Sequence, residues 1–247
     1  FGPRFRDRQG MIGRVDTERL PEPVRGLLDI PDCNTLAVIE MAQVSGLEIL
    51  PPDQRDVLHT STFGTGELIA YAMEQGADAI LLGIGGSATN DLGLGALEAL
   101  GLQIRNQKDQ PLTRITPADW ESVDHFAGGL VHPAADALPP IRIACDVTNP
   151  LFGENGAAAV YGPQKGMKDD QWDYLEREGK RLADAICRYF QKPGSLQEKP
   201  GAGAAGGIGF GLMAAADARL VPGFDLVTAW LELEQHVRNS DLVITGE

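Results

Sequence analysis

Short apolar runs that end at a glycine or an acidic residue recur along the chain and predict buried strands. Ile80–Leu82 is followed by Gly83, and a similar run occupies Leu36–Ile39 before Glu40; Ile141–Cys145, which is apolar except for Arg142, also reads as a strand. Uninterrupted apolar runs of this length are typical of parallel strands that are covered on both faces. We therefore expect these segments to form the centre of a sheet.

Apolar residues with helical spacing lie between and after these runs. They predict helices over residues 68–73, 92–100, 168–190 and 226–237, of which the third is the most clearly amphipathic. An apolar run over residues 241–245 predicts a final strand. Strands that alternate with helices indicate an α/β fold whose sheet is mainly parallel or mixed.

Two segments lack this periodicity. Residues 1–30 are rich in arginine, aspartate and proline, and Pro21, Pro23 and Pro31 favour an extended edge or loop over a helix. We expect this first segment to be flexible or connecting. Residues 103–140 are polar and contain prolines, which predicts an insertion with weak structure of its own.

The composition limits the classes of partner. The 247 residues carry a formal net charge of −14, which disfavours nucleic acids and anionic membranes. No apolar run reaches the roughly 18 residues that a membrane-spanning helix needs. Cys33, Cys145 and Cys187 are scattered, a pattern that fits neither a disulfide framework nor a zinc site and favours the cytoplasm.

Glycine-rich loops carry the main chemical signal. The segment Gly83–Asp91, with the sequence GIGGSATND, joins a predicted strand to a predicted helix. Glycines let a backbone approach an anion closely, and the start of a helix offers unpaired N–H groups, so this arrangement is typical of phosphate sites. Thr60–Glu67, Val147–Gly166 and Gly201–Gly211 are further glycine-rich segments. Several such loops favour an enzyme that transfers a group between two ligands over simple binding.

The nucleotide motifs leave alternatives open. The sequence has no G-x-x-x-x-G-K-[ST] phosphate loop. Gly83-x-Gly85-x-x-Ala88 matches a relaxed dinucleotide pattern, but the acidic residue expected about 20 positions later falls in the loop at Asp109. A dinucleotide-dependent oxidoreductase is therefore one alternative, and a non-catalytic domain that binds sugar acids or other anions is another.

Three charged residues stand in these loops. Asp91 is either a helix N-cap or a catalytic carboxylate, and Asp146 is either a turn-forming residue or a catalytic base or metal ligand. Lys165 is either a solvated surface lysine or the cation of a phosphate site. Residue type and position leave each pair of interpretations open.

Five segments together resemble the bacterial type I glycerate kinase family. They are Gly83–Asp91, Ala144–Leu151 (ACDVTNPL), Gly162–Gly166 (GPQKG), Pro200–Gly207 (PGAGAAGG) and Leu242–Glu247 (LVITGE). The resemblance implies a two-domain α/β protein in which one domain is inserted into the other. It implies that residues 31–240 are the inserted domain, that residues 241–247 return into the outer domain, and that this flavodoxin-like outer domain is largely missing.

The resemblance further implies phosphorylation of D-glycerate by ATP with Mg²⁺, at the 2-hydroxyl, giving 2-phosphoglycerate. A homodimer is an additional expectation, which does not come from the resemblance. From residue type and position we hypothesise that Asp146 or Asp91 is the base, that Asp146 binds the metal, and that Lys165 neutralises a phosphate or the glycerate carboxylate. The expected ligand-binding residues are glycines or carry hydroxyl or amide groups: Gly85, Gly86, Ser87, Thr89, Asn90, Thr65, Asn149, Gly203, Gly206 and Gly207.

Overall fold

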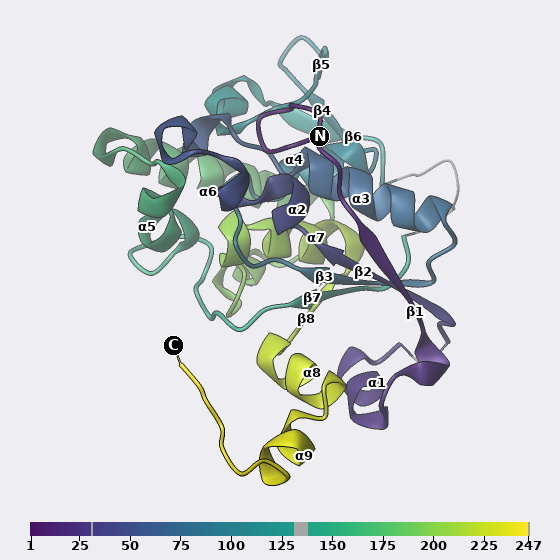
Figure 1. Cartoon of the computed structure of the whole chain (residues 1–247). Helices are drawn as coiled ribbons and strands as arrows, with labels where there is room; N and C mark the ends of the chain where they lie inside the picture. The colour runs from purple at the N-terminus through teal and green to yellow at the C-terminus, as the bar shows by residue number, and fades with distance from the viewer. Residues whose placement is uncertain (31, 131–137, 247) are drawn as a thin grey trace.

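The computed structural model describes residues 1–30, 32–130 and 138–246 (Figure 1). Pro31, residues 131–137 and Glu247 lie outside the described residues, and so do the expectations that rest on them. Within the described ranges, no helix combines the length and the apolar character needed to cross a membrane.

A five-stranded sheet forms the centre of the molecule, in the order β1-β2-β3-β7-β8. β1 is antiparallel to β2, and the other neighbours are parallel, so the predicted mainly parallel or mixed sheet is confirmed. The three strands predicted from apolar runs are its central members. The bounds are β1 (Ile12–Asp16), β2 (Thr35–Glu40), β3 (Ala79–Gly83), β7 (Ile141–Ala144) and β8 (Arg219–Val221).

Helices cover both faces of this sheet. In Figure 1, α3 (Phe63–Glu74), α4 (Leu94–Ala99) and α7 (Ile208–Ala216) lie above it, and α1 (Glu22–Leu28) and α8 (Gly223–Trp230) lie below. Side chains alternate along each strand, so one strand contributes to two cores. Ile80 and Leu82 of β3 join the core on the first face, and Ala79 and Leu81 join the second.

Helices α6, α2 and α5 also belong to the described part of the chain. The amphipathic helix predicted over residues 168–190 is confirmed as α6 (Trp172–Tyr189), whose apolar side packs into the first core. Two short helices, α2 (Ala42–Ser45) and α5 (Ala157–Tyr161), follow β2 and β7 in the chain. The predicted helix over residues 68–73 begins earlier, at Phe63, so the Thr60–Glu67 loop is partly helical.

The expectation that Pro21 and Pro23 favour an extended edge or loop over a helix is wrong for residues 22–28. Residues 22–28 form α1, with Pro23 in its first turn. The first turn of a helix needs no intrahelical N–H donor, so proline fits there. The segment before α1 also contains the edge strand β1, which pairs with β2 from Ile12–Ile39 to Asp16–Thr35.

The segment after α4 has more structure than the sequence predicts. Residues 103–127 contain a small antiparallel sheet in the order β5-β4-β6. Its strands are β4 (Gln103–Arg105), β5 (Pro111–Leu112) and β6 (His125–Ala127). The expectation of weak structure is wrong here because a few buried residues, Ile104, Trp120 and Phe126, anchor an otherwise polar segment in the main core.

The C-terminal part differs from both predictions made for it. The single helix expected over residues 226–237 is two helices, α8 and α9 (Leu233–Arg238), because Glu232 between them has a left-handed φ of 49°. The strand expected over residues 241–245 is absent, and Leu242 and Ile244 are 78% and 89% exposed. An apolar run becomes a strand only where a neighbouring strand takes up its backbone hydrogen bonds.

Candidate functional site

A cavity of about 430 Å³ opens where the central strands β3 and β7 end. In open parallel sheets ligands bind beyond the carboxyl ends of the strands, because the loops that follow them meet there. Four loop segments and Leu47 supply most of the wall. The segments are Ile84–Ser87 after β3, Ala144–Val147 after β7, Gln164–Lys165, and Ala204–Ala205 before α7.

The loop after β3 presents its backbone to this cavity. Leu47 N–H donates to the Gly86 carbonyl at 2.7 Å and Ala88 N–H donates to the Ser45 carbonyl at 2.8 Å, which fixes the loop beside α2. Gly86 has a left-handed φ of +67°, a conformation that favours glycine. The N–H groups of residues 85–87 donate to no acceptor among the described residues, so they are free to bind an anion.

Lys165 lies in the wall beside this loop. Its side chain is only 2% exposed, and its Nζ donates to Ser87 Oγ at 2.8 Å and to the Thr89 carbonyl at 2.7 Å. Nζ also lies 6.0 Å from the centroid of the Tyr161 ring. Burial lowers the pKa of Lys165 to about 7, against the opposing attraction of Asp91. The cavity wall therefore contains an amine that exchanges between its charged and neutral forms near physiological pH.

Asp146 follows the neighbouring strand β7 and brings a carboxylate to the same cavity. It is exposed and lines the cavity, and its Oδ1 accepts a hydrogen bond from Phe224 N–H at 2.9 Å. This contact caps the start of α8 and fixes the side chain. Within the described part of the chain, no group of three or more His, Cys, Asp and Glu side chains is placed to hold a metal ion.

Asp91 lies behind the wall. It is 1% exposed, and its carboxylate accepts hydrogen bonds from Thr62 N–H (2.7 Å), Thr62 Oγ1 (2.9 Å), Gly93 N–H (3.1 Å) and Gly95 N–H (3.2 Å). Burial raises the pKa of Asp91, and these hydrogen bonds act in the opposite direction. The carboxylate joins the starts of α3 and α4, an arrangement that favours the capping interpretation over that of a catalytic base.

The other expected ligand residues divide into two groups. Gly85, Gly86 and Ser87 line the cavity. Thr89 and Asn90 are buried behind the same loop, and Thr89 Oγ1 and Asn90 Oδ1 have no hydrogen-bond partner among the described residues. Gly85, Gly86 and Ser87 are therefore placed to contact a ligand in the cavity, whereas Thr89 and Asn90 lie in the protein interior.

Thr65 and the three glycines of the later loop also lie away from the cavity. Thr65 is buried and bonds to Ser45 Oγ at 2.8 Å. A Cβ at Gly203 or Gly206 would lie 2.1 Å or 2.0 Å from a neighbouring carbonyl oxygen, and one at Gly207 would lie 2.8 Å from a leucine methyl. These glycines permit close packing of two loops, and the alanines between them reach the cavity instead.

Asn149 does not line the cavity itself, but it is hydrogen-bonded to Tyr161, a lining residue that was not predicted from the sequence. Tyr161 lines the cavity, and its hydroxyl donates to Asn149 Oδ1 at 2.6 Å. Asn149 Nδ2 in turn donates to the Asn155 carbonyl at 2.8 Å. The position of Tyr161 directly before the GPQKG segment is a signal that could have identified it. Leu47, which reaches the cavity from a distant part of the sequence, offers no such signal.

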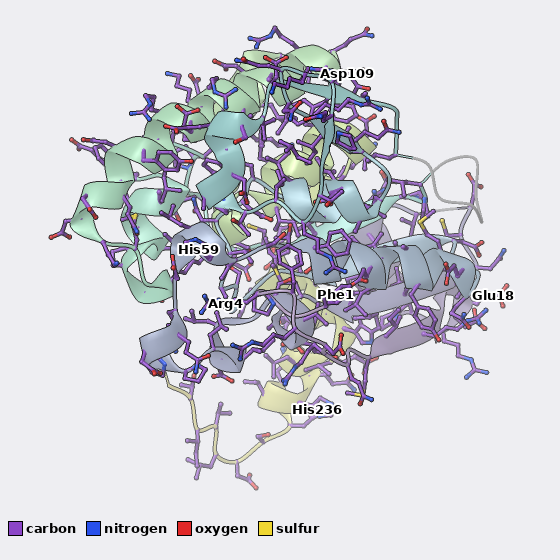
Figure 2. The ribbon with its side chains drawn as sticks, turned by 90° about the horizontal axis from the view of Figure 1, so that it is seen from above. Phe1, Arg4, Glu18, His59, Asp109 and His236 are labelled. Atoms are coloured by element: carbon purple, nitrogen blue, oxygen red, sulfur yellow. The ribbon has the colours of Figure 1, made fainter. Side chains whose placement is uncertain are left out.

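Histidine contributes nothing to the described wall of the cavity. Figure 2 shows His59 and His236 in separate parts of the molecule. His59 Nδ1 instead contacts Asp56 Oδ2 at 2.8 Å on the surface. Asp146 and Lys165 are candidate proton acceptors in the described wall of this cavity.

Known proteins resemble the chain over most of its length. The sequence model of the glycerate kinase family matches residues 9–247. Glycerate 2-kinase of Escherichia coli (strain K12) is 42% identical over 241 residues, which cover 94% of this chain and 60% of that enzyme. Glycerate kinase of Bacillus subtilis (strain 168) is 38% identical over 244 residues, which cover 96% of this chain and 61% of that enzyme.

The fold comparison agrees with the sequence comparison. A crystal structure described as glycerate kinase 2 from Salmonella typhimurium LT2 matches with a TM-score of 0.74 and 42% identity, over 86% of this chain and 56% of that one. The chain thus spans 56% to 61% of the length of these three relatives. From the match of the family model and the identity to these enzymes, we conclude that the chain belongs to the glycerate kinase family.

Proposed function

We propose that the protein of which this chain forms part phosphorylates D-glycerate at its 2-hydroxyl, with ATP as donor. The observation that carries the proposal is the cavity at the ends of β3 and β7, which is lined both by Gly85–Ser87, whose backbone N–H groups have no acceptor among the described residues, and by Lys165. Family membership supports the kinase reaction, and the name of the Escherichia coli relative supports the 2-position. Because the chain covers only part of its relatives, the proposal concerns the complete protein.

The Gly85–Ser87 loop and Lys165 act as the anion subsite. N–H groups and an ammonium stabilise the carboxylate of glycerate or a phosphate of the nucleotide, and the second hydrogen bond of Nζ, to the Thr89 carbonyl, fixes its position. An anion bound here raises the pKa of Lys165 and so shifts the amine towards its charged form. Phosphoryl transfer depends mainly on such positioning and charge stabilisation.

Asp146 is the carboxylate that we assign to the reacting hydroxyl or to Mg²⁺. Mg²⁺ commonly binds through one or two carboxylates together with substrate phosphates, so a single exposed aspartate in the described wall fits this ion when nucleotide is present. When bound, Mg²⁺ neutralises charge on the transferred phosphate. As a base, Asp146 would accept the proton of the glycerate hydroxyl, and its hydrogen bond from Phe224 orients the carboxylate for that role.

The complete protein tests the proposal directly. We expect ADP release that depends on D-glycerate in a coupled assay, and NMR of the product should identify the 2-phosphate. Lys165→Met and Asp146→Asn should each reduce kcat/KM at least 100-fold, whereas Lys168→Met, which changes an exposed lysine nearby, should not.

Each other outcome has a clear meaning. Saturable glycerate binding without ADP release would favour the anion-binding alternative. Stabilisation of the protein against heat by NAD(H) but not by ATP would favour the oxidoreductase alternative. Full activity of both the Lys165 and the Asp146 variants would refute our placement of the site.

Two expectations about the whole protein accompany this proposal. A homodimer and a cytoplasmic location stay predictions, as does the division of the chain at residues 31 and 240. Light scattering coupled to size-exclusion chromatography of the complete protein would test the first, and fractionation of cells would test the second.

A further inference from the structure

The amine of Lys165 has an unusual set of partners. An ammonium group has three N–H donors, and among the described residues Nζ has two acceptors, Ser87 Oγ and the Thr89 carbonyl. A neutral amine keeps two donors, so it can satisfy both acceptors and leave its lone pair in the third position. The site therefore holds the neutral amine without breaking either hydrogen bond.

The protonation of this amine is set by groups that face it. Burial lowers the pKa of Lys165 to about 7, the buried carboxylate of Asp91 acts against this, and the Tyr161 ring lies 6.0 Å away. Asp146 and Cys145 line the same cavity. At neutral pH this lowered pKa makes the free amine far more abundant at Lys165 than at an exposed lysine, whose pKa is about 10.4.

The neighbouring loop adds a binding site for an anion. Gly85, Gly86 and Ser87 line the cavity, their N–H groups donate to no acceptor among the described residues, and Ser87 Oγ is 2.8 Å from Nζ. A ligand whose carboxylate binds this loop would therefore place the next carbon near the amine. In a 2-oxo acid that carbon is an electrophilic carbonyl.

We propose that Lys165 is a covalent binding site for small 2-oxo acids, which its amine captures reversibly as an imine. The nitrogen attacks the carbonyl carbon to form a C–N bond, and two N–H protons leave with the carbonyl oxygen as water. The step needs no oxidant or reductant. The inference rests on residues of this chain and does not depend on kinase activity.

If the protein acts as proposed above, the capture has a regulatory consequence. A 2-oxo acid is the oxidised form of a 2-hydroxy acid such as glycerate. An imine at Lys165 would occupy the anion subsite and remove its charge. The oxidised acid would then block phosphorylation of the reduced one until the imine hydrolyses.

Glyoxylate is the probe, because its carboxylate is attached directly to an aldehyde carbon. The chain is incubated with glyoxylate and cyanoborohydride, which converts the imine to stable carboxymethyl-lysine, and modified peptides are quantified by mass spectrometry. At pH 7 we expect Lys165 to react at least ten times faster than the exposed Lys168 and Lys180. Its rate should level off above about pH 7, whereas theirs should continue to rise towards pH 10.

Two controls keep the test decisive. Unfolding the chain in guanidinium should abolish the difference between Lys165 and the other lysines, and inorganic phosphate should slow the labelling of Lys165 alone. Reaction of Lys165 at the same rate as Lys168 in the folded chain would overturn the proposal. Because no ATP is present, this result is independent of the kinase assay on the complete protein.

Discussion

Substitution of Lys165 by methionine should change how the stability of the protein depends on pH. Methionine has a similar length but no charge. In the folded protein the pKa of Lys165 falls from 10.5 to about 7, whereas the unfolded chain returns the lysine to water. Between these two values the folded state binds fewer protons than the unfolded state, so the stability of the wild-type protein rises with pH in this window.

The size of the effect follows from the two pKa values. Holding a largely buried lysine costs the wild-type protein about 4 kcal/mol at pH 7, and about 2 kcal/mol of that cost disappears by pH 9. The variant also loses the hydrogen bonds to Ser87 and Thr89, each worth about 1 kcal/mol, but that loss varies little with pH. The wild type should therefore gain about 2 kcal/mol relative to the variant between pH 7 and pH 9.

Urea unfolding at pH 7, 8 and 9 measures this difference, with tryptophan fluorescence and circular dichroism as independent probes. Lys168→Met is the matched control, because Lys168 is exposed and its surroundings change little on folding. A difference between wild type and Lys165→Met that stays constant from pH 7 to pH 9 would refute the reasoning. It would mean that the amine stays charged and hydrated in the folded protein.

Four further predictions concern other residues in and around the cavity. Asp91→Asn should lower the free energy of unfolding by roughly 3 kcal/mol, because an amide nitrogen would face N–H donors. Asp146→Asn should lower it by about 1 kcal/mol or less. Urea unfolding midpoints compare the two variants, and equal losses would contradict the structural role of Asp91. Gly206→Ala should cost several kcal/mol, roughly 3, because its φ is +75° and the new Cβ would lie 2.0 Å from a carbonyl oxygen. Gly85→Ala, where the Cβ meets nothing within 4 Å, should keep its stability and weaken phosphate binding in calorimetry; unchanged binding would exclude this loop as the anion site. Tyr161→Phe should lose about 1 kcal/mol in thermal unfolding, and no loss would mean that the hydrogen bond to the Asn149 side chain does not stabilise the loop.

The sequence predicted the elements whose apolar pattern is strong. The strands β2, β3 and β7 consist mainly of apolar residues, and α6 has a clear amphipathic period, so burial largely determines these elements. The small sheet around β4 was missed because its strands are only two or three residues long, too short to show a hydrophobic period. The run at residues 241–245 shows the opposite error, since its residues favour a strand that no neighbour completes.

The sequence predicted where the candidate site lies better than it predicted the function of each residue in it. Glycines and hydroxyls after β3 indicated an anion loop, and Asp146 at the end of β7 lies in the same cavity. Sequence could not separate Asp91 from Asp146, because both follow an apolar strand or begin a helix. Burial separates them, and burial depends on the packing of α3 against α4, which residue type does not reveal.

The loop from Gly83 to Asp91 is held by hydrogen bonds at its start, its middle and its end. Its first residue belongs to the central strand β3, its middle is bonded to the segment around Ser45 and Leu47, and its last residue joins two helices. Ordering a flexible loop on binding would cost about 1–2 kcal/mol for each residue that becomes fixed. Here folding has already met that entropic cost, so a ligand as small as a three-carbon acid, which makes few contacts, can bind without losing affinity to the ordering of its site.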